Sequence, residues 1–251
     1  MASPALKVAV GKASKDALSE NIRRSVIEVE RKFQYHPKFV KRFRMNDGNP
    51  PFRQLDFRGK DSFRDVYYDY KNETLTKSGL WVRQRNGQWE AKVKQNGDFT
   101  NSQFEEVKGR HGVLELLLQL EHQRFLEHQS QAYELPRLDP RDPSFGLSVF
   151  ADLRTTREAW VVNDAFNVVL DTTDFGHGVG EVELEETFTV PAEDSDFPEA
   201  KRQFGADMDQ RIESFMNEHA WAFPPGKPIG KLTAYFAWKR LHADKSNIAT
   251  G

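Results

Sequence analysis

The sequence predicts an α+β domain built around a closed antiparallel sheet. Strand-like segments dominate both halves of the chain, and only a few helical segments lie between them. Along three of the segments, charged residues alternate with apolar ones, so each of these strands has one charged and one apolar face. If helices cover the apolar faces from outside, the charged faces meet inside the closed sheet.

Composition sets the outer limits on fold and partners. The chain has 251 residues, enough for one large domain or two small ones, and its net charge is −2. This charge gives no global basic field, which argues against nucleic acid as a partner. The chain has no cysteine, so disulfides and thiolate metal sites are excluded. No apolar run approaches the roughly 18–20 residues that span a bilayer, and no membrane partner is expected.

The two ends of the chain differ in composition from the rest. Residues 1–24 are small, polar and mildly basic and are expected to form a flexible leader. A single domain is predicted for residues 25–242, followed by a flexible tail at 243–251. A cytoplasmic protein is expected; the alternative is a mitochondrial one, if the leader is an amphipathic targeting segment. Asp16 and Glu20 argue against such a segment.

The first half of the chain alternates strands and turns. A helix is predicted over 36–45, where Phe39 and Phe43 are four residues apart. Asn86-Gly87 is a strong hairpin signal between two strands. Strands are predicted at 25–33, 52–58, 62–70, 79–85, 88–95 and 102–108.

The second half begins with a helix predicted over 112–133, because its leucines form an apolar stripe. A proline-punctuated loop follows at 136–143, and Asn163-Asp164 is a plausible turn. Helices are predicted again over 198–219 and 231–242. Strands are predicted at 147–155, 157–163, 165–172 and 179–190.

Alternating charge is the feature that points to function. Residues 26–33 read VIEVERKF, residues 80–85 read LWVRQR, and residues 180–185 read GEVELE. Taken alone, each such strand is more often a solvated face. Three of them, each with apolar residues in the opposite phase, favour a barrel whose apolar core lies outside and whose charges lie inside.

A charged interior needs charged ligands, because unpaired buried charges cost several kcal/mol each. Arginine and lysine side chains bind phosphate oxygens, and carboxylates bind Mg²⁺ or Mn²⁺, which bridge to phosphate. The pattern leaves open whether Glu105 or Glu106, and whether Arg154 or Arg157, points inward. The other inward candidates are Glu28, Glu30, Lys32, Trp81, Arg83, Arg85, Glu90, Lys92, Lys94, Asp171, Glu181, Glu183 and Glu185.

Other site types are poorly supported. The histidines occur singly, without the spacing of a zinc site. The run 175–180 contains G-x-G-x-G but has no strand–helix context for a nucleotide loop. We expect a flexible turn there, leading into the strand at 181–190.

Taken together, these segments resemble the CYTH superfamily of triphosphate tunnel enzymes, and most closely the eukaryotic thiamine triphosphatases. The resemblance covers roughly residues 25–240, and the N-terminal signature of the family is E-x-E-x-K. The matching segments are IEVERKF at 27–33, RDVYYDY at 64–70, LWVRQR at 80–85, WEAKVK at 89–94, TREAW at 156–160, LDTTDFGHGVGEVELE at 170–185 and KLTAY at 231–235.

The resemblance implies an eight-stranded antiparallel β-barrel, a triphosphate tunnel with helices packed outside, which holds its substrate with a divalent metal, Mg²⁺ or Mn²⁺. Implied substrate ligands are Lys32, Trp81, Arg83, Arg85, Lys92, Arg157 and Lys231, with Trp81 able to stack on an organic ring. Implied metal ligands are Glu28, Glu30, Asp171, Glu181 and Glu183. The catalytic set is expected to be Glu28, Glu30, Lys32, Arg83 and Arg85.

One strand departs from the pattern of this family. Mammalian thiamine triphosphatases carry an Asp two residues before the position of Asp171 and an Arg two residues before that. Here these positions are Val169 and Asn167, so the tunnel loses one acidic and one basic group. A more apolar wall and a changed metal set are therefore expected.

The leading functional hypothesis is metal-dependent hydrolysis of the terminal phosphate of an organic triphosphate, most of all thiamine triphosphate. The partner would be a small di- or triphosphate, bound by a monomer or homodimer. Three alternatives remain open at this stage. They are a lyase or cyclase that expels diphosphate from a nucleotide or isoprenyl diphosphate, an inorganic tripolyphosphatase, and a non-catalytic polyphosphate-binding module.

Overall fold

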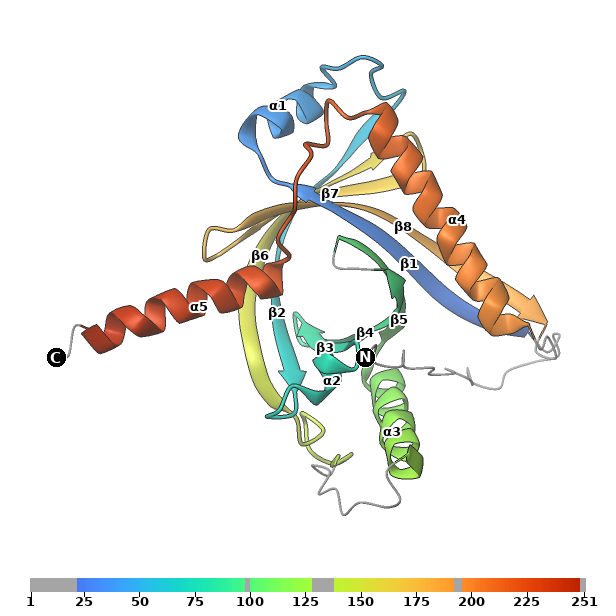
Figure 1. Cartoon of the computed structure of the whole chain (residues 1–251), viewed down its shortest axis with the longest axis vertical. Coiled ribbons are helices and arrows are strands. Elements are labelled where there is room, and N and C mark those ends of the chain that lie inside the picture. The colour runs from blue at the N-terminus through green and yellow to red at the C-terminus, as the bar shows by residue number, and fades with distance from the viewer. Residues whose placement is uncertain (1–21, 98–99, 128–137, 192–195, 249–251) are drawn as a thin grey trace.

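A computed structural model describes residues 22–97, 100–127, 138–191 and 196–248 of the chain (Figure 1). Most strands that are neighbours in the sheet also follow one another in the chain. The strands are β1 Ile22–Gln34, β2 Leu55–Asp69, β3 Leu80–Arg85, β4 Gln88–Gly97, β5 Asn101–Lys108, β6 Ser148–Val162, β7 Phe166–Thr173 and β8 Gly178–Pro191. The helices are α1 Pro37–Met45, α2 Thr74–Lys77, α3 Arg110–Glu127, α4 Phe197–Glu218 and α5 Lys231–Ile248.

The strands form one closed antiparallel ring in the order β1-β5-β4-β3-β2-β6-β7-β8. Strand β1 closes the ring because it pairs with β5 on one side and with β8 on the other. The helices lie outside the ring in Figure 1. The predicted α+β fold, an eight-stranded antiparallel barrel with external helices, is therefore confirmed.

Two long strands were each predicted as two short ones. Segments 52–58 and 62–70 belong largely to β2, and segments 147–155 and 157–163 belong to β6. A bulge between Phe57 and Gly59 shifts the β2–β6 register but lets the strand continue. Because the bulge interrupts the alternation of side chains, the pattern falsely predicts a break.

The short helix α2 was not predicted from the sequence. Its first turn is held by the buried Asp69, which accepts hydrogen bonds from the backbone N–H of Leu75 and of Thr76, both at 2.9 Å. A four-residue helix has no apolar periodicity, so the pattern gave no signal for it.

Both predicted hairpin turns are confirmed. Asn86 and Gly87 have φ of 49° and 81° between β3 and β4, and Asn163 and Asp164 have φ of 52° and 59° between β6 and β7. Positive φ at both central residues matches the right-handed twist of the flanking strands.

The ends of the domain differ from the predicted boundaries. Strand β1 begins at Ile22, inside the predicted leader, and α5 continues to Ile248, inside the predicted tail. The rest of the leader, the last part of the predicted helix 112–133 and residues 249–251 lie outside the described residues.

The apolar core lies outside the ring, as the alternation predicts. Under α1 and α4, strand residues such as Val29 and Val182 pack with Phe43 and Ile212. A second cluster lies under α3, where β3 and β4 contribute side chains such as Val82 and Val93. Where helices cover the outer face of a strand, the other face is left for the interior of the ring. The outer faces of the middle of β2 and β6 are exposed instead, for example at Arg64 and Asp152.

Polar contacts fix α4 on the outer face of β1 and β5. Arg31 binds Asp209 through two hydrogen bonds of 2.7 and 2.9 Å. The buried Lys201 ammonium donates to the Glu105 carboxylate at 2.6 Å. Glu105 therefore points outward, and Glu106 is the member of the pair that points inward.

Gly178 and Gly180 lie in β8 and do not form the flexible turn that was expected. A Cβ on Gly180 would lie 2.1 Å from the ring of Phe33, and one on Gly178 would lie 2.7 Å from that of Tyr35. These glycines let the rings of Phe33, in β1, and of Tyr35, just after β1, lie close against β8. Among the described residues, no helix has the length and apolar character needed to cross a bilayer.

Replacing Gly180 by Ala is expected to destabilise the domain by about 1–3 kcal/mol, because the added methyl overlaps the buried Phe33 ring. Chemical denaturation would measure the loss. Thr172→Ala, at an exposed position of β7, serves as the control and should stay within about 0.5 kcal/mol of the wild type. Equal stabilities of the two variants would contradict the proposed packing role.

Candidate active site

The ring encloses an interior cavity of about 1060 Å³. Charged side chains from β1, β3, β4, β5, β6 and β8 and from the start of α5 line it. Every residue predicted as a substrate ligand is in this lining: Lys32, Trp81, Arg83, Arg85, Lys92, Arg157 and Lys231.

Strand register sets carboxylates opposite one another inside the ring. Glu28 pairs with Glu185, and Glu30 pairs with Glu183, across the β1–β8 ladder. Like charges at directly opposite positions destabilise a sheet. This arrangement weakens the sheet, and replacing one acid of a pair would remove the repulsion in that pair. The presence of both acids therefore favours a binding role for them.

Three of the carboxylates converge on one point. Oxygens of Glu28, Glu30 and Glu183 all lie within 4.8 Å of one another, and Glu28 and Glu30 are buried. Ionised carboxylates only accept hydrogen bonds, and hard divalent cations prefer oxygen ligands. This acidic cluster is therefore suited to hold Mg²⁺ or Mn²⁺.

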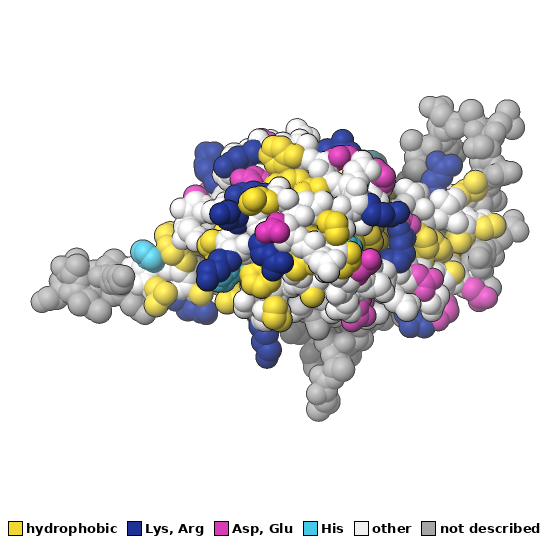
Figure 2. All heavy atoms as spheres, turned by 90° about the horizontal axis from the view of Figure 1, so that it is seen from above, with side chains coloured by type: hydrophobic (Ala, Val, Ile, Leu, Met, Phe, Trp, Pro, Cys, Tyr) yellow, Lys and Arg dark blue, Asp and Glu magenta, His cyan; other side chains and the backbone are white. Residues whose placement is uncertain are grey.

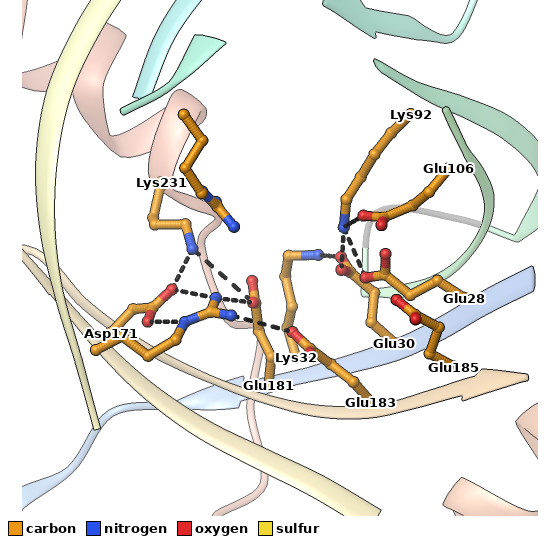
Figure 3. A network of polar contacts seen from close by, with 12 residues as sticks. Glu28, Glu30, Lys32, Lys92, Glu106, Asp171, Glu181, Glu183, Glu185 and Lys231 are labelled. Carbon is orange, nitrogen blue, oxygen red and sulfur yellow. Dashed lines mark hydrogen bonds and ion pairs between the residues drawn. The ribbon is translucent and has the colours of Figure 1, made fainter. Parts of the chain in front are cut away.

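A lysine from the far side of the ring partly neutralises the acidic cluster (Figure 3). The Lys92 ammonium lies 2.6 Å from Glu28 Oε1 and 3.5 Å from both Glu30 Oε2 and Glu106 Oε1. Lys32 contacts Glu30 from the same strand. These cations stand beside the proposed metal position, where they can also reach a phosphate.

The second charged cluster consists of Arg157, from β6, and its partners. Among these partners, Figure 3 labels Asp171, Glu181 and Lys231. The Arg157 guanidinium donates to both oxygens of Asp171, at 2.7 and 2.8 Å, and to Glu181 Oε2 at 3.2 Å. Lys231, the first residue of α5, also donates to Asp171. The register confirms that Arg157, and not Arg154, faces the interior.

Asp171 and Glu181 lie apart from the acidic cluster, although both were predicted as metal ligands. Asp171 is completely buried, and both of its oxygens accept hydrogen bonds from cations. Glu181 lies between Arg157 and Lys231. The residues that the structure brings together for a metal are Glu28, Glu30 and Glu183.

Asp65 is a site residue that the sequence analysis missed. It is completely buried inside the ring and accepts two hydrogen bonds of 2.9 Å from Arg85. Its Oδ2, one of these two acceptors, also lies 3.8 Å from Arg83 Nη1. The alternation of Phe63, Asp65 and Tyr67 along β2 could have revealed that Asp65 points into the ring. The surrounding aromatic residues indicated a packed segment instead.

Burial and neighbouring charges shift the protonation of the acidic cluster. Burial raises the pKa of Glu28 well above its usual range, and the charges of Glu30 and Glu183 raise it further against the effect of Lys92. Burial likewise raises the pKa of Glu183 to about 7, with the Arg157 charge opposing the shift and the Glu181 charge adding to it. Both groups therefore resist ionisation until a cation joins them.

The cations dominate elsewhere in the cavity. Burial disfavours ionisation of Glu181, yet Lys231, Lys32 and Arg157 together hold its pKa well below the usual range. Burial also opposes ionisation of Glu106, but a hydrogen bond with Glu28 and the charge of Lys92 outweigh it and lower the pKa to about 2.

The departures at Asn167 and Val169 both face the interior side of β7. Asn167 lies opposite Glu183, and Val169 lies opposite Glu181. Neither contributes a charge, so Glu183 has Arg157 as its nearest described cation, at 3.9 Å. This weak pairing is one physical reason for the raised pKa of Glu183.

Aromatic residues form the remaining wall of the cavity. Trp81 meets Phe104 edge-on, with ring centroids 5.6 Å apart. Phe150 stacks on Phe236 of α5 at 5.7 Å. All four residues line the cavity, together with Leu232, so one part of it suits an organic group.

Comparison with known proteins identifies the family. The family model of the CYTH domain matches residues 26–212, which include all eight strands except the first residues of β1. The chain belongs to the CYTH domain family. The human protein named thiamine-triphosphatase is 27% identical over 221 residues, covering 84% of this chain and 86% of the human one.

Solved structures of similar CYTH-like topology share less sequence. The PH1819 protein of Pyrococcus horikoshii OT3 is 16% identical, with a TM-score of 0.47, and the match covers 84% of this chain and 98% of that one. A putative adenylyl cyclase from Hippeastrum, described as having a dominant triphosphatase activity, is 15% identical with a TM-score of 0.46. That match covers 84% of this chain and 95% of the Hippeastrum chain.

The raised pKa of Glu183 predicts how stability depends on pH. A proton held in the folded state up to about pH 7 means that stability falls as pH rises from about 4.5 to about 7. In a chelator, the wild type should lose about 1–3 kcal/mol more than Glu183→Gln between about pH 5 and about pH 8. Denaturant unfolding at each pH measures this difference.

Added Mg²⁺ should remove the difference, since bound metal favours the ionised carboxylate. Identical pH profiles for the wild type and Glu183→Gln in the chelator would show that Glu183 ionises normally in the folded protein.

Proposed function

We propose that this chain is a metal-dependent phosphohydrolase that removes the terminal phosphate of an organic triphosphate, with thiamine triphosphate as the first candidate. The observation that carries the proposal is the interior cavity, where cations face a cluster of carboxylates inside one closed sheet. Similarity to the human protein named thiamine-triphosphatase supports the choice of substrate.

The triphosphate would be held by the cations of the cavity wall. Arg83, Arg85 and Arg157 offer planar donor groups that match phosphate oxygens in pairs, and Lys32 and Lys231 add compact charges. Each of these side chains is already oriented by a carboxylate. Because this orientation exists before the substrate arrives, little side-chain entropy remains to be lost on binding.

Asp65 and Asp171 act in this proposal as positioning residues and do not bind metal. Each is completely buried and binds an arginine through two hydrogen bonds. The guanidinium of that arginine keeps further N–H groups for the substrate.

The acidic cluster of Glu28, Glu30 and Glu183 would hold the metal, because its oxygens converge and their mutual repulsion calls for a cation. A bound Mg²⁺ or Mn²⁺ supplies charge neutralisation and polarisation of water in phosphoryl transfer.

The protein's own contribution to the reaction is positioning and charge. Phosphoryl transfer needs little covalent chemistry from a protein, so an activated side-chain nucleophile is not required. Cations such as Arg83 and Lys231 would stabilise the charge that develops on the terminal phosphate and the leaving oxygen. Oxygens of the acidic cluster would accept hydrogen bonds from the attacking water and orient it.

The aromatic wall would receive the organic group. Trp81 stands beside the phosphate-binding Arg83, two residues along β3, and its ring forms part of the cavity surface. An aromatic ring attached to the phosphates could stack on Trp81 while the phosphates reach the cations.

Substituting a cavity charge is expected to abolish turnover while the fold remains. Arg83→Ala and Glu181→Ala should each lower kcat/KM by about 100-fold or more, because each removes a contact or an orienting charge at the reacting phosphate. Arg64→Ala is the matched control, since Arg64 lies on β2 outside the cavity in an exposed pair with Asp152. Full activity of both cavity variants would rule out this site.

A product assay tests the reaction itself. With Mg²⁺ or Mn²⁺, the protein should release inorganic phosphate from thiamine triphosphate faster than from tripolyphosphate, ATP or isoprenyl diphosphates, and should stop when a chelator is added. Release of diphosphate would instead identify the lyase or cyclase alternative. Tight binding without any turnover would identify a polyphosphate-binding module.

A further inference from the structure

We infer that the exposed face of α1, together with the adjoining outer edge of β2, is a docking surface for an anionic lipid membrane. We call this surface the α1 patch. It consists of Lys38, Lys41, Arg42, Arg44, Met45, Phe57, Arg58 and Lys60, all of which are exposed.

The composition of α1 is unusual for a helix on the surface of an acidic protein. Between Pro37 and Met45 it has Lys38, Lys41, Arg42 and Arg44 and no acidic residue. Val40 and Phe43 are buried and anchor the helix on the barrel. The remaining side chains therefore form an outward face that carries four cations and no acid.

Arg42 and Arg44 lie in the last turn of α1, where the helix dipole favours cations, but helix stability does not account for Lys38 and Lys41. Lys38 lies in the first turn, where the positive end of the helix dipole disfavours a cation. Lys38 also lies three residues from Lys41 and four from Arg42, at spacings where like charges repel each other. Acidic residues in place of Lys38 and Lys41 would stabilise the helix, so these two lysines point to a role outside the fold.

The α1 patch continues onto β2. Arg44 of α1 and Lys60 of β2 both contact Glu158, at 2.6 and 3.6 Å. Phe43 of α1 and Phe57 of β2 both contact the ring of Trp160, with centroids 5.1 and 5.2 Å away. Shared neighbours on β6 thus join the two segments into one surface.

Few acids neutralise the α1 patch. Among the described ion pairs, Glu158 is shared by Arg44 and Lys60, and Asp56 lies 3.8 Å from Arg58. Lys38 and Lys41 have no acidic partner among the described residues. On a chain of net charge −2, this local excess would turn the patch toward an anionic surface.

Exposed apolar side chains within the α1 patch favour lipid over nucleic acid. Met45 is 64% exposed and Phe57 is 57% exposed, and both lie among the cations. Seen from above, Figure 2 shows dark blue Lys and Arg side chains, yellow apolar ones and some magenta acidic ones at the end of the molecule that carries α1. A lipid interface accepts both kinds of group, whereas phosphodiester contacts would leave Met45 and Phe57 in water.

The number of cations fits a peripheral contact. Clusters of about four to eight Lys and Arg residues on an amphipathic helix bind acidic phospholipids. Such a contact needs no segment that spans the bilayer. No membrane partner was expected from the sequence, because that expectation rested only on the lack of an apolar run long enough to span a bilayer.

Vesicle co-sedimentation tests the inference. The full chain should bind vesicles of phosphatidylcholine with phosphatidylserine, should not bind pure phosphatidylcholine, and should dissociate as salt is raised. Each basic residue near such a surface is worth about fivefold in the partition coefficient, so Lys38→Glu with Lys41→Glu should weaken binding at least about 25-fold. Met45→Ser should weaken it to a smaller extent.

The charge-matched control is Lys71→Glu with Arg141→Glu, at exposed positions outside the α1 patch. Acidic residues suit the N-terminal part of a helix, so the α1 double variant should fold as well as the wild type. Equal binding by the two double variants would overturn the inference. So would tight binding of a random-sequence DNA duplex through α1 without any binding to the acidic vesicles.

Discussion

Facing carboxylates between β1 and β8 are the constraint on which the rest of the structure depends. Glu28 faces Glu185 and Glu30 faces Glu183 across a continuous ladder, inside a closed sheet. Such a ladder would be unstable if it stood alone, because these charges repel one another at short range. The opposing charge comes from Lys32 of β1 and from other strands of the ring, as with Lys92 of β4.

This requirement explains why the molecule has its apolar core on the outside. The interior faces of the strands carry many buried charges, so the hydrophobic effect acts mainly on their outer faces. Helices α1, α3 and α4 supply the apolar surface that covers them. The charged interior and the external apolar core thus both result from the period-two alternation of side chains along the strands.

The alternation is also what made much of the site predictable. Which residues share a face is a local property of a strand, so Glu28, Glu30, Lys32 and Arg83 were placed correctly in the interior from sequence alone. Which residues become partners is a non-local property. The pairing of Asp171 with Arg157 and Lys231 depends on the β6–β7 register and on α5.

Other features were hidden for equally physical reasons. Asp65 lies between aromatic residues on a strand that was predicted in two pieces, so its alternation with Phe63 and Tyr67 indicated packing and not a partner for Arg85. The bulge after Phe57 broke the period that would have revealed one long strand. The choice between Glu105 and Glu106 depended on Lys201, which is far away along the chain.

Closure of the ring by β1 and β8 has a consequence for how the protein forms during synthesis. Strand β1 is synthesised first and its partner β8 is the last strand to be synthesised. The two can therefore pair only after most of the chain has left the ribosome. Until then β1 carries an unpaired edge and a row of carboxylates in water, and a long loop must close before they are buried. A nascent chain that stops before residue 178 lacks β8 and cannot complete the ring.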